Sequence, residues 1–213
     1  MDPVVPDPQA IETAGKTIRS GGVVVFPAQC LYGLACDAAD PAAVRKIFAL
    51  KQRPETKALL ILIDSPDQIP GLVKEIPKAA RILMDAFWPG GITLVFGAAD
   101  HLGTDLTAGT GKIGIRLPAH PVARALVSQA GRPITGTSAN LSGHPGCDRA
   151  VDLPREISHG ADQVLDAGQL KGGPGSTVVD VTTLPLTLLR EGVISKEEIC
   201  TALEPLLPGA CPP

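Results

Sequence analysis

Short runs of consecutive apolar residues recur along this 213-residue chain and alternate with amphipathic segments. The runs GVVVF at 22–26 and ALLILI at 58–63 contain no polar side chain, which is typical of strands buried on both faces. Between them, Asp40-Pro41 is a helix start signal, and the residues that follow place apolar side chains on one face at helical spacing. This alternation predicts a layered α/β domain.

The same patterns predict the other elements of a single domain over residues 1–213, with its core at about 11–206. Asp7-Pro8 and Gly21-Gly22 bracket a first helix. Because some of the predicted strands follow one another directly, the sheet is expected to be mixed. The Pro-rich ends, including PGACPP at 208–213, are expected to be loose. Further helices are expected at 79–87, 120–130 and 196–206, and further strands at 92–96, 113–117, 133–137, 163–165, 177–181 and 186–189.

Charge and cysteine content argue against several classes of protein. A net charge of −3 argues against charge-driven binding of nucleic acid over a large surface. The five cysteines include no CxxC pair, so neither a disulfide framework nor a zinc site is expected, and a reducing, cytoplasmic location fits best. The N-terminal MDPVVPDPQA lacks the basic start of a signal peptide, and no apolar run is long enough to span a membrane.

Two polar clusters follow predicted elements. Lys51-Gln52-Arg53-Pro54, with Lys57 close behind, places three cations where the helix after Asp40 ends. These cations are either a solvated helix end that suits the helix dipole or a clamp for phosphate groups. The segment TGTSANLSG at 135–143 follows a predicted strand and is either a polar turn or a ligand-binding loop.

Three further features concern charge and glycine. Arg116 lies within the apolar run IGIRLP, so its charge is either paired or lines a cleft, since an unpaired buried charge is costly. The segment GGPGST at 172–177 is either an anion cradle or a plain flexible loop. GTGKIG at 109–114 precedes a strand instead of following one, which argues against a dinucleotide fingerprint. The four histidines lack metal-ligand spacing and are expected at the surface or at helix caps.

Together these segments resemble the YrdC/Sua5 family over about residues 18–194. The most specific part is Lys51-x-Arg53 combined with Ser138-x-Asn140. The resemblance implies an α/β (α+β) domain of the YrdC/RibB-like type: a twisted, open, mixed sheet with helices on both faces and a large, concave, positively charged cleft. The matching pieces, in order, are FPAQCLYGLACDA, FALKQRP, FWPGGITLVF, IGIRLPAHP, TGTSANLSG, GSTVVDVT and LLREGVI.

The resemblance also implies a nucleotidyltransferase, L-threonylcarbamoyladenylate synthase. L-threonine, bicarbonate and ATP would give threonylcarbamoyl-AMP and pyrophosphate for the t6A modification of tRNA, with Mg²⁺ on the phosphates. The implied partners are tRNA and the downstream t6A transferase proteins, with weak RNA binding in addition. Two alternatives stay open: another carbamoyl-adenylate chemistry, and a double-stranded RNA or ribosome-binding module.

By the same resemblance, family roles carry over to individual positions, and no side chain is expected to bind a metal on its own. Arg116 would pair with the threonine carboxylate. Lys51 and Arg53 would be catalytic. The expected ATP contacts are Lys51, Arg53, Lys57, Lys112, Asn140, Asp148 and Arg190, and the expected threonine contacts are Cys30, Leu62, Arg116, Ser138 and Ser176.

This chain departs from the family in its first loop. Members usually carry Pro-Thr-x-Thr-x-Tyr-Gly-Leu, whereas this chain has Ala28 and Cys30 at the two hydroxyl positions. A polar residue such as histidine is also usual near Leu62. These changes are expected to affect the amino-acid pocket more than the ATP pocket. The match is to the short, single-domain form, so the extra C-terminal domain of the longer members is not expected.

Overall fold

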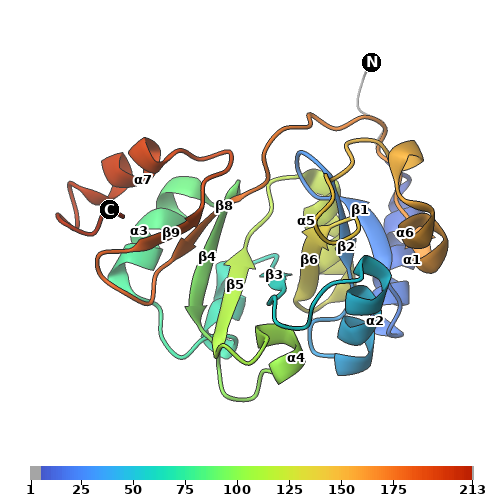
Figure 1. The fold of residues 1–213 in the computed structure, drawn as a ribbon, viewed down its shortest axis with the longest axis horizontal. Helices are drawn as coiled ribbons and strands as arrows, with labels where there is room; N and C mark the ends of the chain where they lie inside the picture. The colour runs from blue at the N-terminus through green and yellow to red at the C-terminus, as the bar shows by residue number, and fades with distance from the viewer. Residues whose placement is uncertain (1–5, 213) are drawn as a thin grey trace.

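Nine strands form one open, mixed sheet in the computed structural model, which describes residues 6–212 (Figure 1). The spatial order is β7-β1-β2-β6-β3-β5-β4-β8-β9. The pairs β1/β7, β3/β5 and β4/β8 are parallel and the others are antiparallel, which confirms the predicted mixed sheet. The strands are β1 Val24–Pro27, β2 Tyr32–Ala35, β3 Leu60–Leu62, β4 Ile92–Gly97, β5 Lys112–Arg116, β6 Ile134–Ser138, β7 Gln163–Val164, β8 Thr177–Asp180 and β9 Thr187–Arg190.

The first two helices begin where the sequence places aspartate caps. The Asp7 carboxylate accepts from the backbone N–H of Gln9 at the start of α1, and Asp40 accepts from Ala42 N at 2.8 Å at the start of α2. No helix among residues 6–212 is both long and apolar enough to cross a membrane. The α-helices are α1 Pro8–Arg19, α2 Pro41–Lys51, α3 Lys78–Phe87, α4 Thr104–Thr107, α5 Pro121–Ala130, α6 Arg155–Gly160 and α7 Lys196–Leu203, with 3₁₀ turns at Pro66–Gly71 and Ala150–Asp152.

The two faces of the sheet carry separate apolar cores. On one face, Ile18 of α1 and Leu126 of α5 pack with Val24 of β1 and Leu62 of β3. On the other face, α2, α3, α4, α6 and α7 bury a larger core around Ile61 of β3. Because successive strand residues point to opposite faces, adjacent Ile61 and Leu62 serve different cores. Helices therefore cover both faces, as predicted.

Strand β2 and helices α4 and α6 were not expected from the sequence. Strand β2 lies in the stretch read only as a loop, since it spans just four residues and includes Gly33. Its Tyr32 is fully buried, and the Tyr32 hydroxyl accepts from the backbone N–H of Ala167 at 2.9 Å. This contact joins the first loop to the segment after β7. The loop is therefore held on both sides by the fold.

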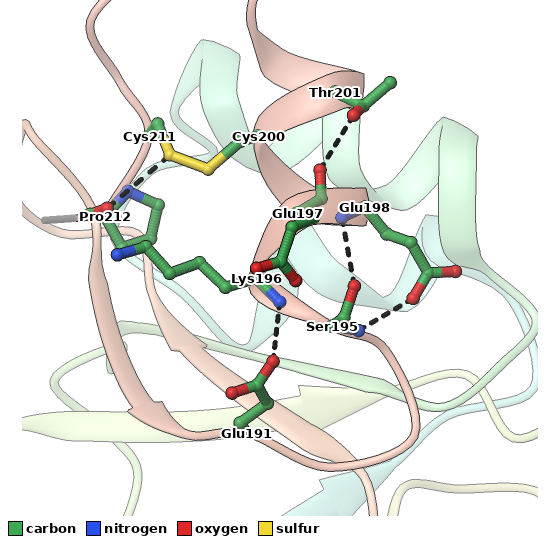
Figure 2. Close-up of a disulfide and its surroundings, with 9 residues drawn as sticks. All are labelled: Glu191, Ser195, Lys196, Glu197, Glu198, Cys200, Thr201, Cys211 and Pro212. Carbon is green, nitrogen blue, oxygen red and sulfur yellow. Dashed lines mark hydrogen bonds between the residues drawn. A yellow bond between two sulfur atoms is a disulfide. The ribbon is translucent and has the colours of Figure 1, made fainter.

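The C-terminal segment differs from two expectations. Cys200 of α7 and Cys211 form a disulfide with their Cα atoms 4.9 Å apart, so the expectation of no disulfide is wrong at this pair (Figure 2). Ala210 is buried and its carbonyl accepts from Leu186 N at 3.0 Å, so this end is not loose up to residue 212. The pair lacks a recognisable spacing because α7 and the turn after it bring the two thiols together. The N-terminal expectation falls partly on residues 1–5, outside the described range.

Replacing both Cys200 and Cys211 with serine should lower the free energy of unfolding by about 2–3 kcal/mol, since the bridge closes a short loop in the unfolded chain. The two cysteines are 11 positions apart. Urea unfolding of the parent and the double variant measures the difference. Cys147→Ser, at a free cysteine, is the matched control and should change stability less. Equal unfolding midpoints for the parent and the double variant would contradict a stabilising bridge.

Candidate functional site

A cavity of about 670 Å³ lies on the sheet face that α1 and α5 cover only in part. This volume is within the range of about 300–1,000 Å³ that small-molecule sites occupy. Few side-chain atoms project into the cavity from the sheet that forms its floor, because Gly114 and Gly136 flank Leu60 on the neighbouring strands. A Cβ atom added to Gly136 would lie 2.7 Å from Cγ of Leu62, so a larger residue there requires the floor to move.

The cavity gathers most of the site residues expected from the sequence, although they are far apart along the chain. Arg53 follows α2, Ser138 ends β6, and Arg190 ends β9. The central position of β6, β3 and β5 in the sheet is what brings these ends together. The expected residues that line the cavity are Cys30, Arg53, Lys112, Arg116, Ser138, Asn140, Ser176 and Arg190.

Arg116 is the most unusual residue in this cavity. Its residue surface is only 7% exposed, and within residues 6–212 its guanidinium has no hydrogen bond or ion pair, with Nε buried and unpartnered. Burial, and after it the positive charge of Arg190, lower the pKa of Arg116 to about 10, while Cys30 acts in the opposite direction. Since a buried charge without a counter-charge is costly, this arrangement is suited to an anionic ligand.

Lys51 lies behind the cavity wall instead of in it. The residue is 2% exposed, and its ammonium donates to the carbonyl of Ser138, to the carbonyl of Asn140 at 2.8 Å and to Asn140 Oδ1 at 3.1 Å. Its own carbonyl accepts from Ser142 N at 2.8 Å. The last residue of α2 thus anchors the loop after β6. The ammonium has three acceptors within hydrogen-bond distance, so in this structure Lys51 positions the loop and does not line the cavity.

Arg53 reaches the cavity because α2 ends in a tight turn. Gln52 has a positive φ of 48°, in the left-handed region, and reverses the chain. The Arg53 side chain then donates from Nε to the Lys57 carbonyl at 3.0 Å and from Nη2 to the Ala58 carbonyl at 2.8 Å. Lys57 itself is exposed and does not line the cavity. The guanidinium of Arg53 is therefore pre-positioned by the backbone that follows it.

The glycine-rich segment at 172–177 forms one wall of the cavity. Arg190 donates from Nε and Nη2 to the Ser176 carbonyl, at 3.1 and 2.7 Å, and so ties this segment to β9. The Ser176 hydroxyl lies 2.8 Å from that of Thr93, which also lines the cavity. Thr93 was missed from the sequence. Its signal was available, because it is a lone hydroxyl within the apolar run ITLVF, as Arg116 is a lone charge within IGIRLP.

Three other expected contacts differ in their surroundings. Lys112 lines the cavity but is paired with Asp180, with Nζ and Oδ2 2.7 Å apart. Leu62 is fully buried against α1 and α5 and does not line the cavity, whereas Leu60 on the same strand face does. Asp148 also lies outside the lining and accepts from the Gln169 side chain at 3.3 Å.

The charges of the cavity favour anionic ligands. Among the described residues, its lining has four cationic side chains and one carboxylate, that of Asp180. No group of three or more His, Cys, Asp or Glu within residues 6–212 could hold a metal ion. Clefts lined by one sign of charge concentrate ligands of the opposite sign. The four cations are Arg53, Lys112, Arg116 and Arg190.

Comparison with known proteins identifies the family of this chain. The family model for the Sua5, YciO and YrdC proteins, described as telomere recombination, matches residues 16–192. The chain belongs to this family. A threonylcarbamoyl-AMP synthase of Pyrococcus abyssi is 39% identical over 189 residues, which are 89% of this chain and 56% of that protein. The chain thus spans little more than half the length of this relative.

Shorter relatives and solved structures of the Sua5/YciO/YrdC family agree with this assignment. A putative threonylcarbamoyl-AMP synthase of Mycobacterium tuberculosis is 38% identical over 198 residues, covering 92% of this chain and 89% of that protein. The crystal structure of P. abyssi Sua5 complexed with L-threonine superposes with a TM-score of 0.89 at 37% identity. It covers 92% of this chain and 58% of the P. abyssi chain.

Proposed function

We propose that this chain forms threonylcarbamoyl-AMP and pyrophosphate from L-threonine, bicarbonate and ATP. The observation that carries the proposal is the buried guanidinium of Arg116, which has no counter-charge among the described residues and lines a cationic cavity. An amino-acid carboxylate supplies that counter-charge, and a triphosphate matches the remaining cations. The names of the relatives and the L-threonine complex of P. abyssi Sua5 support the same substrates.

In this mechanism the chain acts by positioning and charge stabilisation. Arg116 holds the threonine carboxylate, with the Thr93 and Ser176 hydroxyls beside it, and Arg53 and Arg190 face the phosphates. The threonine amine condenses with bicarbonate and water leaves; the resulting N-carboxylate attacks the α-phosphate and displaces pyrophosphate. Such a reaction needs no covalent nucleophile from the protein. Since the described residues offer no metal-ligand cluster, Mg²⁺ fits here only as an ion carried by the ATP phosphates.

Pyrophosphate release from ATP tests the proposal when threonine and bicarbonate are omitted in turn. We expect release only with both present, and a product with the mass of threonylcarbamoyl-AMP. Release that needs carbamoyl phosphate in place of bicarbonate would instead indicate another carbamoyl-adenylate chemistry. Binding of double-stranded RNA without any turnover would indicate the RNA-binding alternative. In the next step that we propose, t6A transferase proteins transfer the product to tRNA in the cytoplasm.

Restoring the two hydroxyls of the first loop should sharpen amino-acid selection. Ala28 and Cys30 both line the cavity, so this loop faces the proposed substrate. One neutral hydrogen bond contributes about 0.5–1.5 kcal/mol, so Ala28→Thr/Cys30→Thr should raise the preference for threonine over valine by a few-fold to about tenfold. The ratio of kcat/KM for the two amino acids measures it. An unchanged ratio would mean that the loop does not read the side chain.

Turnover should fall as the pH rises above about 8. Burial, with a smaller effect of Arg53, lowers the pKa of Lys51 to about 8, and the neutral amine has lost one of the N–H groups that hold the loop after β6. Stability should not fall with it. Between about pH 8 and the ordinary value of 10.5 the unfolded chain binds the extra proton, so this group makes stability rise with pH.

Profiles of kcat/KM against pH, with unfolding measured in parallel, test this prediction. Lys51→Met should reduce activity and remove the alkaline decline, because it has no titrating group at this position. Lys46→Met is the matched control on the same helix, where the ammonium donates to the Gly21 carbonyl at the surface, and it should keep the decline. A decline that persists in Lys51→Met would assign the titration to another group.

A further inference from the structure

Cys30 carries a thiol whose chemistry the proposed reaction does not use. It is a free, half-exposed thiol, and it lines the same cavity as the unpaired guanidinium of Arg116. We propose that Cys30 is a reversible modification site that exchanges with small disulfides carrying carboxylate groups, with Arg116 holding the carboxylate. The ligand class is thus an anionic disulfide, and the modified protein carries half of it as a mixed disulfide in the amino-acid pocket.

Arg116 is as important to this site as the thiol itself. Its guanidinium is more than nine-tenths buried, lines the cavity and has no partner within the described residues. Cys30 is close enough for its charge to act on the pKa of Arg116, against the larger effects of burial and Arg190. A reagent that places a carboxylate on Arg116 therefore brings its sulfur near the Cys30 thiol. A cationic reagent is repelled from the same cavity by its four positive side chains.

The chain contains its own control for this selectivity. Cys147 is also free and half-exposed, but the charges that act on its thiol are the carboxylates of Asp152 and Asp148. Its Sγ lies 3.2 Å from the Asp152 carbonyl, and burial, then Asp152 and Asp148, raise the pKa of this thiol. Cys147 is therefore expected to prefer cationic over anionic reagents. The third free cysteine, Cys36, is buried and its pKa is raised to about 12, so it should not react.

The exchange is chemically complete without any further cofactor. The thiolate of Cys30 attacks one sulfur of the small disulfide, a new S–S bond forms, the original S–S bond breaks, and the other half leaves as a thiolate. The proton of Cys30 passes to solvent. A reducing thiol reverses the reaction. On the proposed function, the bound half occupies the threonine position, so oxidation would stop turnover and reduction would restore it.

Two disulfides of opposite charge test the inference: glutathione disulfide, which is anionic, and cystamine, which is cationic. The untagged parent protein is exposed briefly to each, without nucleotide, and modification at each cysteine is followed by peptide mass spectrometry. We expect the rate ratio, anionic over cationic, to be at least about tenfold higher at Cys30 than at Cys147. Equal ratios at the two sites, or no reaction at Cys30, would overturn the proposal. This comparison within one molecule needs no variant.

A charge change at Arg116 provides the second arm. Arg116→Gln should lower the anionic-over-cationic rate ratio at Cys30 towards the ratio at Cys147. Arg116→Lys keeps the positive charge and should keep most of the ratio. Circular dichroism checks that both variants are folded. If the Arg116→Gln protein keeps the full rate ratio at Cys30, Arg116 does not select the reagent, and the proposal is overturned. Because labelling is measured without ATP or turnover, a failed synthase assay leaves this result intact. A failed labelling preference likewise leaves the proposed synthase activity standing.

Discussion

Arg116→Met should greatly reduce threonine-dependent pyrophosphate release while making the fold more stable. The guanidinium is buried without a counter-charge among residues 6–212, so an apolar side chain of similar length removes a desolvation cost. Replacing even a buried ion pair by well-packed apolar residues often stabilises by about 1–4 kcal/mol, and the charge of Arg116 has no partner that offsets its desolvation. The threonine carboxylate would lose its charged partner, which costs about 2–5 kcal/mol, or at least roughly thirtyfold in kcat/KM. Unfolding curves and steady-state kinetics on the same protein measure both effects.

Arg132 is the matched control for this prediction. It also carries a guanidinium beside the core, but it forms an ion pair at 2.7 Å with Asp37, whose side chain is 6% exposed. Arg132→Met leaves that carboxylate unpaired, so stability should fall while kcat/KM changes little. We therefore expect Arg116→Met to raise the free energy of unfolding and Arg132→Met to lower it. This difference is expected if Arg116 serves a ligand and Arg132 serves the fold. A loss of stability in Arg116→Met would mean that Arg116 has a structural role.

Arg53→Ala should reduce pyrophosphate release by about 100-fold to 1,000-fold, as removal of one preorganised donor to developing charge usually does. Arg53 lines the cavity, and the Lys57 and Ala58 carbonyls hold its guanidinium in place. The fold should survive, since the side chain is only partly buried and two lost hydrogen bonds cost about 1 kcal/mol each. Kinetics at saturating threonine and bicarbonate, with circular dichroism of the variant, make the measurement.

Two further arginine variants are controls for the activity loss expected in Arg53→Ala. Arg45→Ala changes an arginine within α2, the helix that Arg53 follows; Arg45 pairs with Asp105 at the surface, so turnover should stay nearly unchanged. Arg53→Lys keeps the charge but lacks the planar fork, so it should recover only part of the activity. Near parental turnover in Arg53→Ala would refute the phosphate role.

The sequence predicted the elements of the fold well where periodicity and caps are local. The apolar runs at 58–63 and 92–96 correspond to β3 and β4, and Asp40-Pro41 begins α2 as expected. Strand β2 was missed because its four residues include a glycine and follow a turn, so no alternation can be recognised. The disulfide was missed because its partners are joined by a helix and a turn, and no short spacing announces them.

Candidate site residues could be chosen from their chemistry, but their surroundings could not. Arg116 was recognised as a charge that must be paired or line a cleft, and the structure decides for the cleft because no carboxylate of the described chain faces it. Lys51 and Arg53 were treated alike as part of one cluster. The turn at Gln52 separates them, with one side chain directed behind the wall and the other into the cavity.

The sequence alone determined the element types, the family resemblance and the choice of polar residues, since these depend on order and spacing along the chain. Only the tertiary structure decided which of them meet. The strand order places β6, β3 and β5 at the centre of the sheet, so the end of α2, the loop after β6 and the glycine-rich segment at 172–177 converge on one face. The burial of each site residue and the charges around it depend on how these segments come together. They leave Arg116 without a counter-charge and enclose Lys51 among carbonyl groups, and neither outcome follows from local sequence.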